Sequence, residues 1–253
     1  MWQWDRSNYL KYGDANTRWF HSRASMRKAK NAISGLRENE GVLQTSLDGI
    51  TDVVTNFYGH LFSSSHPRDF AEVLDCVTPC VTETMNNTFC APYTREEVDY
   101  ALKQMHLYQA PVPDEMNPFL FQRFWDIIGN YITTAVISIL NGHAIPPKLN
   151  HTFVAFIPKK TKSDLISDFY PISLCNVIYK LITKVISNRL KPLLPFIISD
   201  TQRAFVHRPL ISDNILIAFG VLHAMHGDNA TMNSMAIKLD MSKAFDRIEW
   251  PFC

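Results

Sequence analysis

The stretch from Met235 to Trp250 constrains this chain more than any other. Its first part, Met235–Leu239, is short, apolar and partly β-branched, which predicts a buried strand. Asp240 follows directly, and Asp246 stands on what would be the first turn of a helix. Mg²⁺ takes one or two protein carboxylates and leaves its other positions to phosphates and water. The pattern therefore indicates a hard-cation site, although a turn or helix-capping role for either aspartate would explain it as well.

The residue identities in this stretch narrow the interpretation. Residues 238–246 read Lys-Leu-Asp-Met-Ser-Lys-Ala-Phe-Asp and resemble the first palm motif of reverse transcriptases from non-LTR (LINE-type) retrotransposons, most closely those of plant genomes. The resemblance implies that Asp240 binds both catalytic Mg²⁺ ions. It also implies that Phe245 is a steric gate against the ribose 2′-hydroxyl and that Asp246 lies with it at the incoming nucleotide.

A second matching stretch predicts a basic hairpin. Residues 157–159 read Ile-Pro-Lys and residues 169–174 read Phe-Tyr-Pro-Ile-Ser-Leu, which resembles the fingers segment that holds the triphosphate in this family. Lys159 is the expected phosphate contact. Tyr170 stands where the family has arginine, and the loss of a charged contact of about 1.5–3 kcal/mol would weaken nucleotide binding roughly tenfold or more.

A third stretch, Ser199–Val206, resembles the template-side loop of the family and implies that Gln202, Phe205 and Arg208 contact the template. Here the family's Pro-Gly turn is replaced by His-Arg-Pro at 207–209. A further departure is Val112, which occupies a usual glycine position in the loop 109–116. Where that loop needs a positive φ, valine costs about 1–2 kcal/mol or more. These changes, together with Tyr170, are typical of a decayed element copy, or are simply tolerated.

Charge is unevenly distributed behind the net value of +1. Residues 18–37 hold six basic and no acidic side chains, and residues 158–208 hold nine basic against three acidic ones. Between them, residues 66–130 hold ten acidic against four basic ones. Two basic blocks suit two polyanion-binding surfaces, and basic residues mixed with aromatics near the N-terminus suit RNA. Solvated basic helix faces remain an equal alternative.

Hydrophobic periodicity predicts an α+β fold that is rich in helix. A short hairpin is expected over 31–44 and a strand over 151–157. On the helix 174–194 we expect four basic side chains to point outward: Lys180, Lys184, Arg189 and Lys191. The expected helices span residues 17–30, 46–62, 94–106, 118–140, 174–194 and 213–226.

Three domains are predicted along the chain. Residues 1–92 form a basic, helical N-terminal extension that resembles the endonuclease-to-polymerase linker of the family. Residues 93–150 form a helical segment on the fingers side. Residues 151–253 form a partial reverse transcriptase domain, so the whole is an incomplete right-hand polymerase with fingers and the start of the palm.

The five cysteines show no metal-binding or disulfide spacing, and no apolar run approaches the roughly 20 residues of a membrane span. We therefore expect an intracellular chain without a membrane anchor, and the resemblance implies the nucleus. The implied partners are an RNA template, a DNA primer and a deoxynucleoside triphosphate, with two Mg²⁺ ions as cofactors.

The family's second carboxylate cluster is an Asp-Asp pair, and no such dipeptide occurs in these 253 residues. The sequence thus predicts a fragment of an RNA-directed DNA polymerase that is inactive alone, because one carboxylate cluster cannot hold two ions. Two alternatives stay open. The chain is a catalytically dead RNA-binding remnant, or it is a non-functional product of a decayed element.

Overall fold

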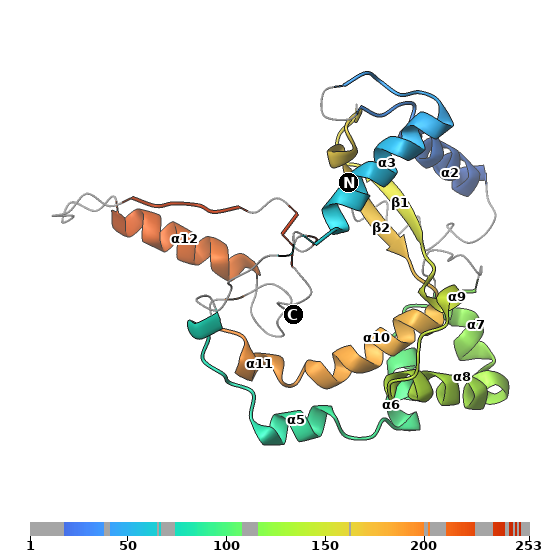
Figure 1. The fold of residues 1–253 in the computed structure, drawn as a ribbon, viewed down its shortest axis with the longest axis vertical. Coiled ribbons are helices and arrows are strands. Elements are labelled where there is room, and N and C mark those ends of the chain that lie inside the picture. Colours follow the sequence, from blue (N-terminus) through green and yellow to red (C-terminus); the bar gives the residue numbers. More distant parts are fainter. Residues whose placement is uncertain are drawn as a thin grey trace. The chain divides into compact units, whose positions relative to one another are not determined.

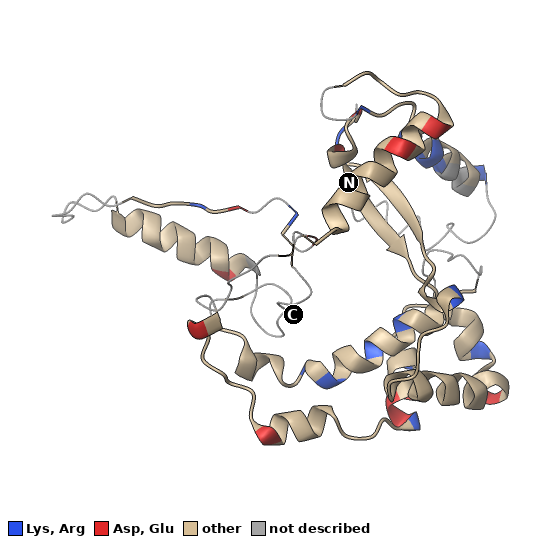
Figure 2. Cartoon of the chain, viewed as in Figure 1, with Lys and Arg blue, Asp and Glu red and all other residues tan. Residues whose placement is uncertain are grey.

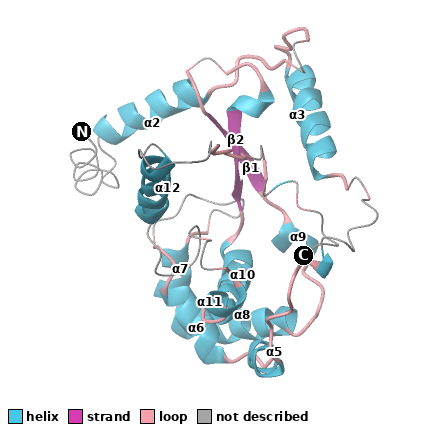
Figure 3. Cartoon of the chain, turned by 90° about the vertical axis from the view of Figure 1, so that its left-hand side faces the viewer, coloured by secondary structure: helices cyan, strands magenta, loops and turns pink. Residues whose placement is uncertain are grey.

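The computed structural model describes residues 18–37, 41–64, 66, 74–107, 116–161, 163–199, 202, 211–225, 235–240, 243–244, 246 and 248. The described residues are mainly helical, with one two-stranded sheet, so the predicted α+β class is confirmed (Figures 1 and 3). The chain divides into two compact units that do not follow sequence order. Unit 1 comprises 1–65, 154–173 and 245–253, and unit 2 comprises 66–153 and 174–244. The three domains predicted along the chain stay a prediction.

Unit 1 packs a helix against a hairpin. Helix α3 (Leu47–Phe62) is capped by Ser46, whose hydroxyl accepts a hydrogen bond from the Gly49 amide at 3.1 Å. The hairpin consists of β1 (Phe153–Pro158) and β2 (Phe169–Leu174), with the short 3₁₀ helix η1 (Ile166–Asp168) leading into β2. The core between them consists of Leu36, Val53, Ile166 and Phe169, all at most 4% exposed. Helix α2 (Arg18–Asn31) precedes this core, close to the predicted range.

The short hairpin predicted over 31–44 is present as a single antiparallel bridge among the described residues. The amides and carbonyls of Leu36 and Gln44 exchange hydrogen bonds of 2.9 and 2.8 Å. The next residue, Arg37, also pairs with a segment more than a hundred positions away. Its amide donates to the Asp164 carbonyl at 2.6 Å and its Nε donates to the Asp164 carboxylate at 3.0 Å. This contact ties the N-terminal part of unit 1 to the connection between β1 and β2.

Unit 2 is a helical bundle with its own core. Helices α6 (Arg95–Lys103), α8 (Trp125–Leu140) and α10 (Val177–Leu190) bury a shared cluster of apolar side chains, including Val98, Val136 and Leu181 at 0% exposure. The predicted capping box of α6 is confirmed, because the Thr94 and Glu97 side chains each accept from the other residue's amide. The remaining helices of unit 2 are α5 (Glu83–Phe89), α7 (Pro118–Arg123), α9 (Pro147–Asn150), α11 (Leu194–Ile197) and α12 (Ile211–Met225).

The single helix predicted over 118–140 is wrong, because the chain leaves helical geometry at Phe124 (φ −106°, ψ 19°) and forms α7 and α8 instead. Each half is fixed separately to α6. The Gln122 amide group donates to the carbonyls of Leu102 and Met105, and the Trp125 indole donates to the Asp99 carboxylate at 2.8 Å. A change of axis at Phe124 allows both sets of hydrogen bonds to form.

The helix predicted from residue 174 begins later, at Val177. Residues 169–174 belong to β2, and Asn176 caps α10 by accepting from the Tyr179 amide at 2.9 Å. The Asn176 amide group also donates to the Leu149 carbonyl at 2.8 Å, which holds the start of α10 against α9. The strand pairing of 169–174 overrides the helical periodicity of the sequence there.

The buried strand predicted over Met235–Leu239 is also wrong. These residues have no regular secondary structure, and Met235, Ile237 and Leu239 are 69–88% exposed. A strand needs a neighbour to satisfy its backbone, and residues 235–239 pair with no strand in the described part of the chain. Helix α12, which comes before this segment, likewise exposes apolar side chains such as Ile215 and Phe219.

Candidate functional site

Lys159 lies where β1 ends, on the predicted basic hairpin. Its amide donates to the Asp168 carbonyl at 2.8 Å, which closes the hairpin. Its ammonium group donates to the Ser167 carbonyl at 2.8 Å and lies 4.9 Å from the centroid of the Tyr170 ring. The side chain is thus folded back on its own hairpin, with a carbonyl and an aromatic face as partners.

Tyr170, which stands at the family's arginine position, lies on β2 with 58% of its surface exposed. The neighbouring Lys160 is neutralised, since its ammonium group lies 2.8 Å from the Asp168 carboxylate, whose side chain is only 19% exposed. The hairpin therefore offers a mixed surface. It has one tethered lysine, one ion pair and one exposed aromatic ring.

The predicted metal ligand, Asp240, directly follows the incorrectly predicted strand, in a segment without regular secondary structure. Its side chain is 83% exposed, and its nearest charged partner is the Lys238 ammonium group at 4.0 Å. An exposed carboxylate of this kind can ligate one hard cation whose other positions are filled by water. It is not held in position by burial, and its contact with Lys238 is the only ion pair that it makes with a described residue.

Asp246 lies in unit 1, has 3₁₀ backbone geometry and is half-buried. The phenol of Tyr58 is close enough to sense its charge. Burial raises the pKa of Tyr58, and the negative charge of Asp246 raises it further. Asp240 belongs to unit 2, so the structure does not bring the two aspartates into one compact unit.

A site for two Mg²⁺ ions needs several carboxylates at once. The residues that the structure describes gather no group of three or more Asp, Glu, His or Cys side chains that could hold a metal ion. The donors that are described fit a single, mostly hydrated cation at Asp240 and do not fit the two-ion centre.

The template-side residues are mostly outside the described part of the chain. Phe205, Arg208 and the substituted turn at 207–209 are outside the described residues. Phe245 and Val112, which belong to other predicted features, are outside them as well. Gln202 is described and exposed, and its backbone N–H donates to the Ser199 carbonyl at 2.9 Å.

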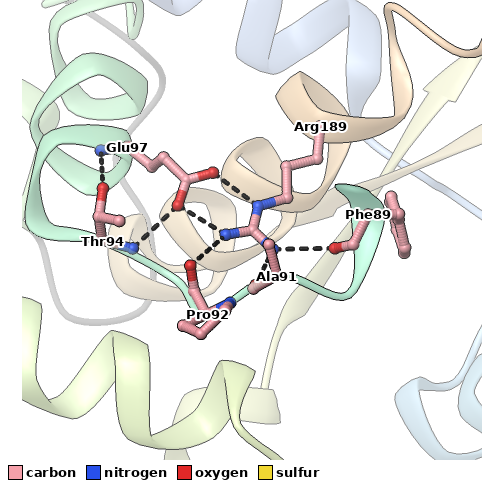
Figure 4. Close-up of polar contacts among 6 residues, drawn as sticks. All are labelled: Phe89, Ala91, Pro92, Thr94, Glu97 and Arg189. Atoms are coloured by element: carbon pink, nitrogen blue, oxygen red, sulfur yellow. Dashed lines mark hydrogen bonds and ion pairs between the residues drawn. The ribbon is translucent and has the colours of Figure 1, made fainter. Parts of the chain in front are cut away.

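The prediction that Arg189 points outward is wrong. Its side chain is only 10% exposed, and all five of its N–H donors have acceptors (Figure 4). Two donate to the Glu97 carboxylate at 2.6 and 2.8 Å. The others donate to the carbonyls of Phe89, Ala91 and Pro92, and the guanidinium stacks 3.7 Å from the Tyr93 ring centroid.

Helical spacing contained the signal for this position. Arg189 follows Leu181 and Val185 at intervals of four, and both of those side chains are fully buried. The row of buried side chains on α10 therefore ends in a charge, which needs a partner inside the bundle. Arg189 is thus a structural residue that fixes the N-terminus of α6, and the basic face expected on α10 is smaller than predicted.

No described helix is both long enough and apolar enough to cross a membrane.

Residues 157–253 match the family model for reverse transcriptase (RNA-dependent DNA polymerase). This matched region contains the hairpin lysine, Asp240, Asp246 and the template-side stretch.

A curated relative extends the similarity over most of the chain. It is the "Transposon TX1 uncharacterized 149 kDa protein" of Xenopus laevis, 28% identical over 237 residues. The alignment covers 93% of this chain but only 18% of the relative. The chain thus spans less than a fifth of the relative that it matches, and its C-terminal 97 residues are similar to reverse transcriptases.

Proposed function

We propose that the chain is part of the RNA-directed DNA polymerase of a retrotransposon, of the non-LTR (LINE) type and most similar to plant elements. The observation that carries the proposal is the match of residues 157–253 to reverse transcriptases, over a segment that includes Asp240. The 28% identity to a transposon protein supports the mobile-element origin. The nucleus is then the site of action, because a retrotransposon inserts into nuclear DNA.

The proposed substrates are an RNA template, a DNA primer and a deoxynucleoside triphosphate. Gln202, Phe205 and Arg208 would contact the template, and Phe245 and Asp246 would contact the nucleotide. Lys159 would bind the triphosphate by exchanging its bond to the Ser167 carbonyl for one to a phosphate oxygen. The exchange is favourable, because a hydrogen bond between two charged groups is stronger than one to a neutral carbonyl.

Mg²⁺ would supply the charge that stabilises the transferring phosphoryl group, and Asp240 is the proposed ligand. The 253 residues hold no Asp-Asp dipeptide, and the described ones gather no group that could hold two ions. We therefore propose that this stretch, taken alone, binds substrates without catalysing their reaction.

Nucleotide binding tests the role of Lys159. Calorimetric titration with a deoxynucleoside triphosphate, on a preformed RNA–DNA template–primer with Mg²⁺, should give about tenfold or more weaker binding for Lys159→Gln. Lys148→Gln is the matched control, because Lys148 is an exposed lysine on α9. Equal affinities for Lys159→Gln and the unaltered chain would contradict the assignment.

A second candidate is an RNA-binding remnant with no nucleotide site. The basic residues of α2 favour it, since residues 18–37 include no acidic side chain. This candidate predicts RNA binding that weakens with salt, together with no detectable nucleotide binding by any variant. A non-functional product would instead melt without cooperativity and bind neither ligand.

A further inference from the structure

Helix α2 carries positive charge without compensation inside its own segment. Its 14 residues include five Lys or Arg side chains and no acidic one, and Lys28 and Lys30 lie in the last turn. Figure 2 shows basic residues and no acidic ones along this helix. The partial negative charge at a helix C-terminus accounts for two basic residues there. It does not account for Arg23 and Arg27, which lie farther from that end, and like charges at these spacings repel one another.

Three of these bases share one face of α2. Arg23, Arg27 and Lys30 are spaced by four and three residues, which places them in a row about 10 Å long. We call these three side chains the α2 basic row. Arg27 and Lys30 are exposed, and no described acidic side chain forms an ion pair with either of them.

Both described acidic residues of the β1–β2 connection are already paired. Asp164 is held by Arg37 at 3.0 Å, and Asp168 is held by Lys160 at 2.8 Å. The positive potential along the α2 basic row is therefore not cancelled by the β1–β2 connection.

The row ends at a pocket of about 300 Å³, which lies wholly within unit 1. Lys30 lines the pocket together with hydroxyl groups from two distant segments, namely Ser34 after α2 and Thr161 and Ser163 after β1. The Ser163 hydroxyl donates to the Lys160 carbonyl at 3.0 Å. Those of Ser34 and Thr161 make no hydrogen bond with any described residue, so both can donate to a ligand. Asp164 also lines the pocket, with its charge offset by Arg37.

An ammonium group with two available hydroxyl donors suits a phosphate, and a row of further cations leading away from it suits a chain of phosphates. A membrane surface fits less well, because a surface-bound helix needs an apolar face. Beyond Trp19 and Phe20 in its first turn, the sequence of α2 has a single large apolar residue, Met26. We propose that the α2 basic row and its end pocket bind the backbone of single-stranded RNA, with one phosphate in the pocket against Lys30, Ser34 and Thr161.

The surface lies in unit 1, whereas the described template-side residue, Gln202, lies in unit 2. The inference deepens the proposed function, from which it takes the identity of the polyanion as RNA. It adds a second RNA contact, whose residues on and just after α2 (Arg23, Arg27, Lys30 and Ser34) precede the residues 157–253 that match the reverse transcriptase model. The remaining hydroxyl-bearing partner of the phosphate, Thr161, lies within them.

The test is fluorescence anisotropy with a labelled 20-nucleotide oligouridylate, without Mg²⁺ or nucleotides, over a range of salt concentrations. For Arg27→Gln/Lys30→Gln we expect several-fold weaker binding at low salt and a slope of log K against log salt that is smaller by about 1.4, or 0.7 for each lost contact. Lys103→Gln/Lys148→Gln removes the same charge from exposed positions in unit 2 and should leave the slope unchanged.

A third variant tests the pocket without changing charge. Thr161→Val keeps the shape but removes a donor, and it should weaken binding with no change in slope. The proposal is overturned if Arg27→Gln/Lys30→Gln binds like the unaltered chain, or if both double variants lose affinity equally. Asp240→Ala should bind RNA as the unaltered chain does, because Asp240 is not part of this surface. If the chain binds RNA through α2 but binds no nucleotide, this proposal is sustained and the polymerase proposal fails.

Discussion

At the scale of single residues, Arg189 determines more of the structure than any residue predicted to be functional. Its guanidinium joins the carboxylate of Glu97 to three backbone carbonyls that would otherwise lack partners at the turn before α6. The planar fork of arginine is required, because an ammonium group cannot serve both carboxylate oxygens and three carbonyls at once.

We expect Arg189→Lys to lower the free energy of unfolding by about 2 kcal/mol, because charge is kept while several charge-assisted hydrogen bonds are lost. Urea denaturation followed by circular dichroism measures this. Lys191→Arg makes the reverse exchange at an exposed position just beyond α10 and should be neutral. An unchanged midpoint for Arg189→Lys would show that the fork is not needed.

The same ion pair predicts a pH dependence. Hydrogen bonds from Arg189 lower the pKa of Glu97, partial burial opposes the shift, and the Thr94 amide lowers the pKa further. A carboxyl group with a depressed pKa in the folded state stabilises the fold above its unfolded pKa of about 4.3, and this contribution is lost as pH falls through the folded value. Glu97→Gln should therefore be less stable than the unaltered chain at pH 7, and the difference should shrink below about pH 4. A constant difference across this range would refute the linkage.

At the scale of elements, local signals predicted most helices. Ser46, Thr94 and Asn117 cap helices as their side-chain chemistry favours, and α2, α3, α6 and α12 lie close to their predicted ranges. The break at Phe124 and the unpaired segment 235–239 could not be predicted in this way. Both depend on partners that are distant in the sequence: α6 in the first case, and a neighbouring strand in the second.

The break at Phe124 can be tested through the bond that fixes α8. Trp125→Phe removes the indole donor to Asp99, which is 2.8 Å away, and should cost about 1–3 kcal/mol because the carboxylate loses a partner. Tyr131→Phe removes a phenol that is on the same helix but 80% exposed, and should cost little. Thermal denaturation of both variants measures this, and we expect a lower melting temperature for Trp125→Phe than for Tyr131→Phe. Equal melting temperatures would mean that the bond to Asp99 does not hold α8.

For the predicted site residues, the sequence could predict their positions on strands and helices but not their contacts with distant segments. Lys159 was placed correctly at the end of β1, because Pro158 and the strand-forming residues before it are local signals. Its bonds to Ser167 and Tyr170 could not be foreseen, since they depend on how the β1–β2 connection folds back. The gathering of carboxylates around Asp240 is likewise a non-local property, and it stays a prediction.

At the scale of the whole molecule, the described residues form two separate apolar cores. The cluster around Leu36 and Phe169 lies in unit 1, and the cluster around Val136 and Leu181 lies in unit 2. No described cluster of buried side chains draws residues from both units. The two units should therefore unfold in separate transitions.

Matched core variants test this. Leu36→Ala and Leu181→Ala each remove a fully buried side chain and should each cost about 2–5 kcal/mol. Leu36→Ala should shift one calorimetric transition and Leu181→Ala the other. A single transition that both variants shift equally would show that the two units unfold together.

Primer extension on an RNA template, with Mg²⁺ and all four deoxynucleoside triphosphates, tests the central claim most directly. The account predicts no extension by the 253-residue chain or by Asp240→Ala, because these 253 residues include no Asp-Asp dipeptide and the described ones gather no group of carboxylates for the two-ion reaction. Extension by the unaltered chain that Asp240→Ala abolishes would contradict it. That result would mean that further carboxylates of this chain, such as Asp246, complete the site.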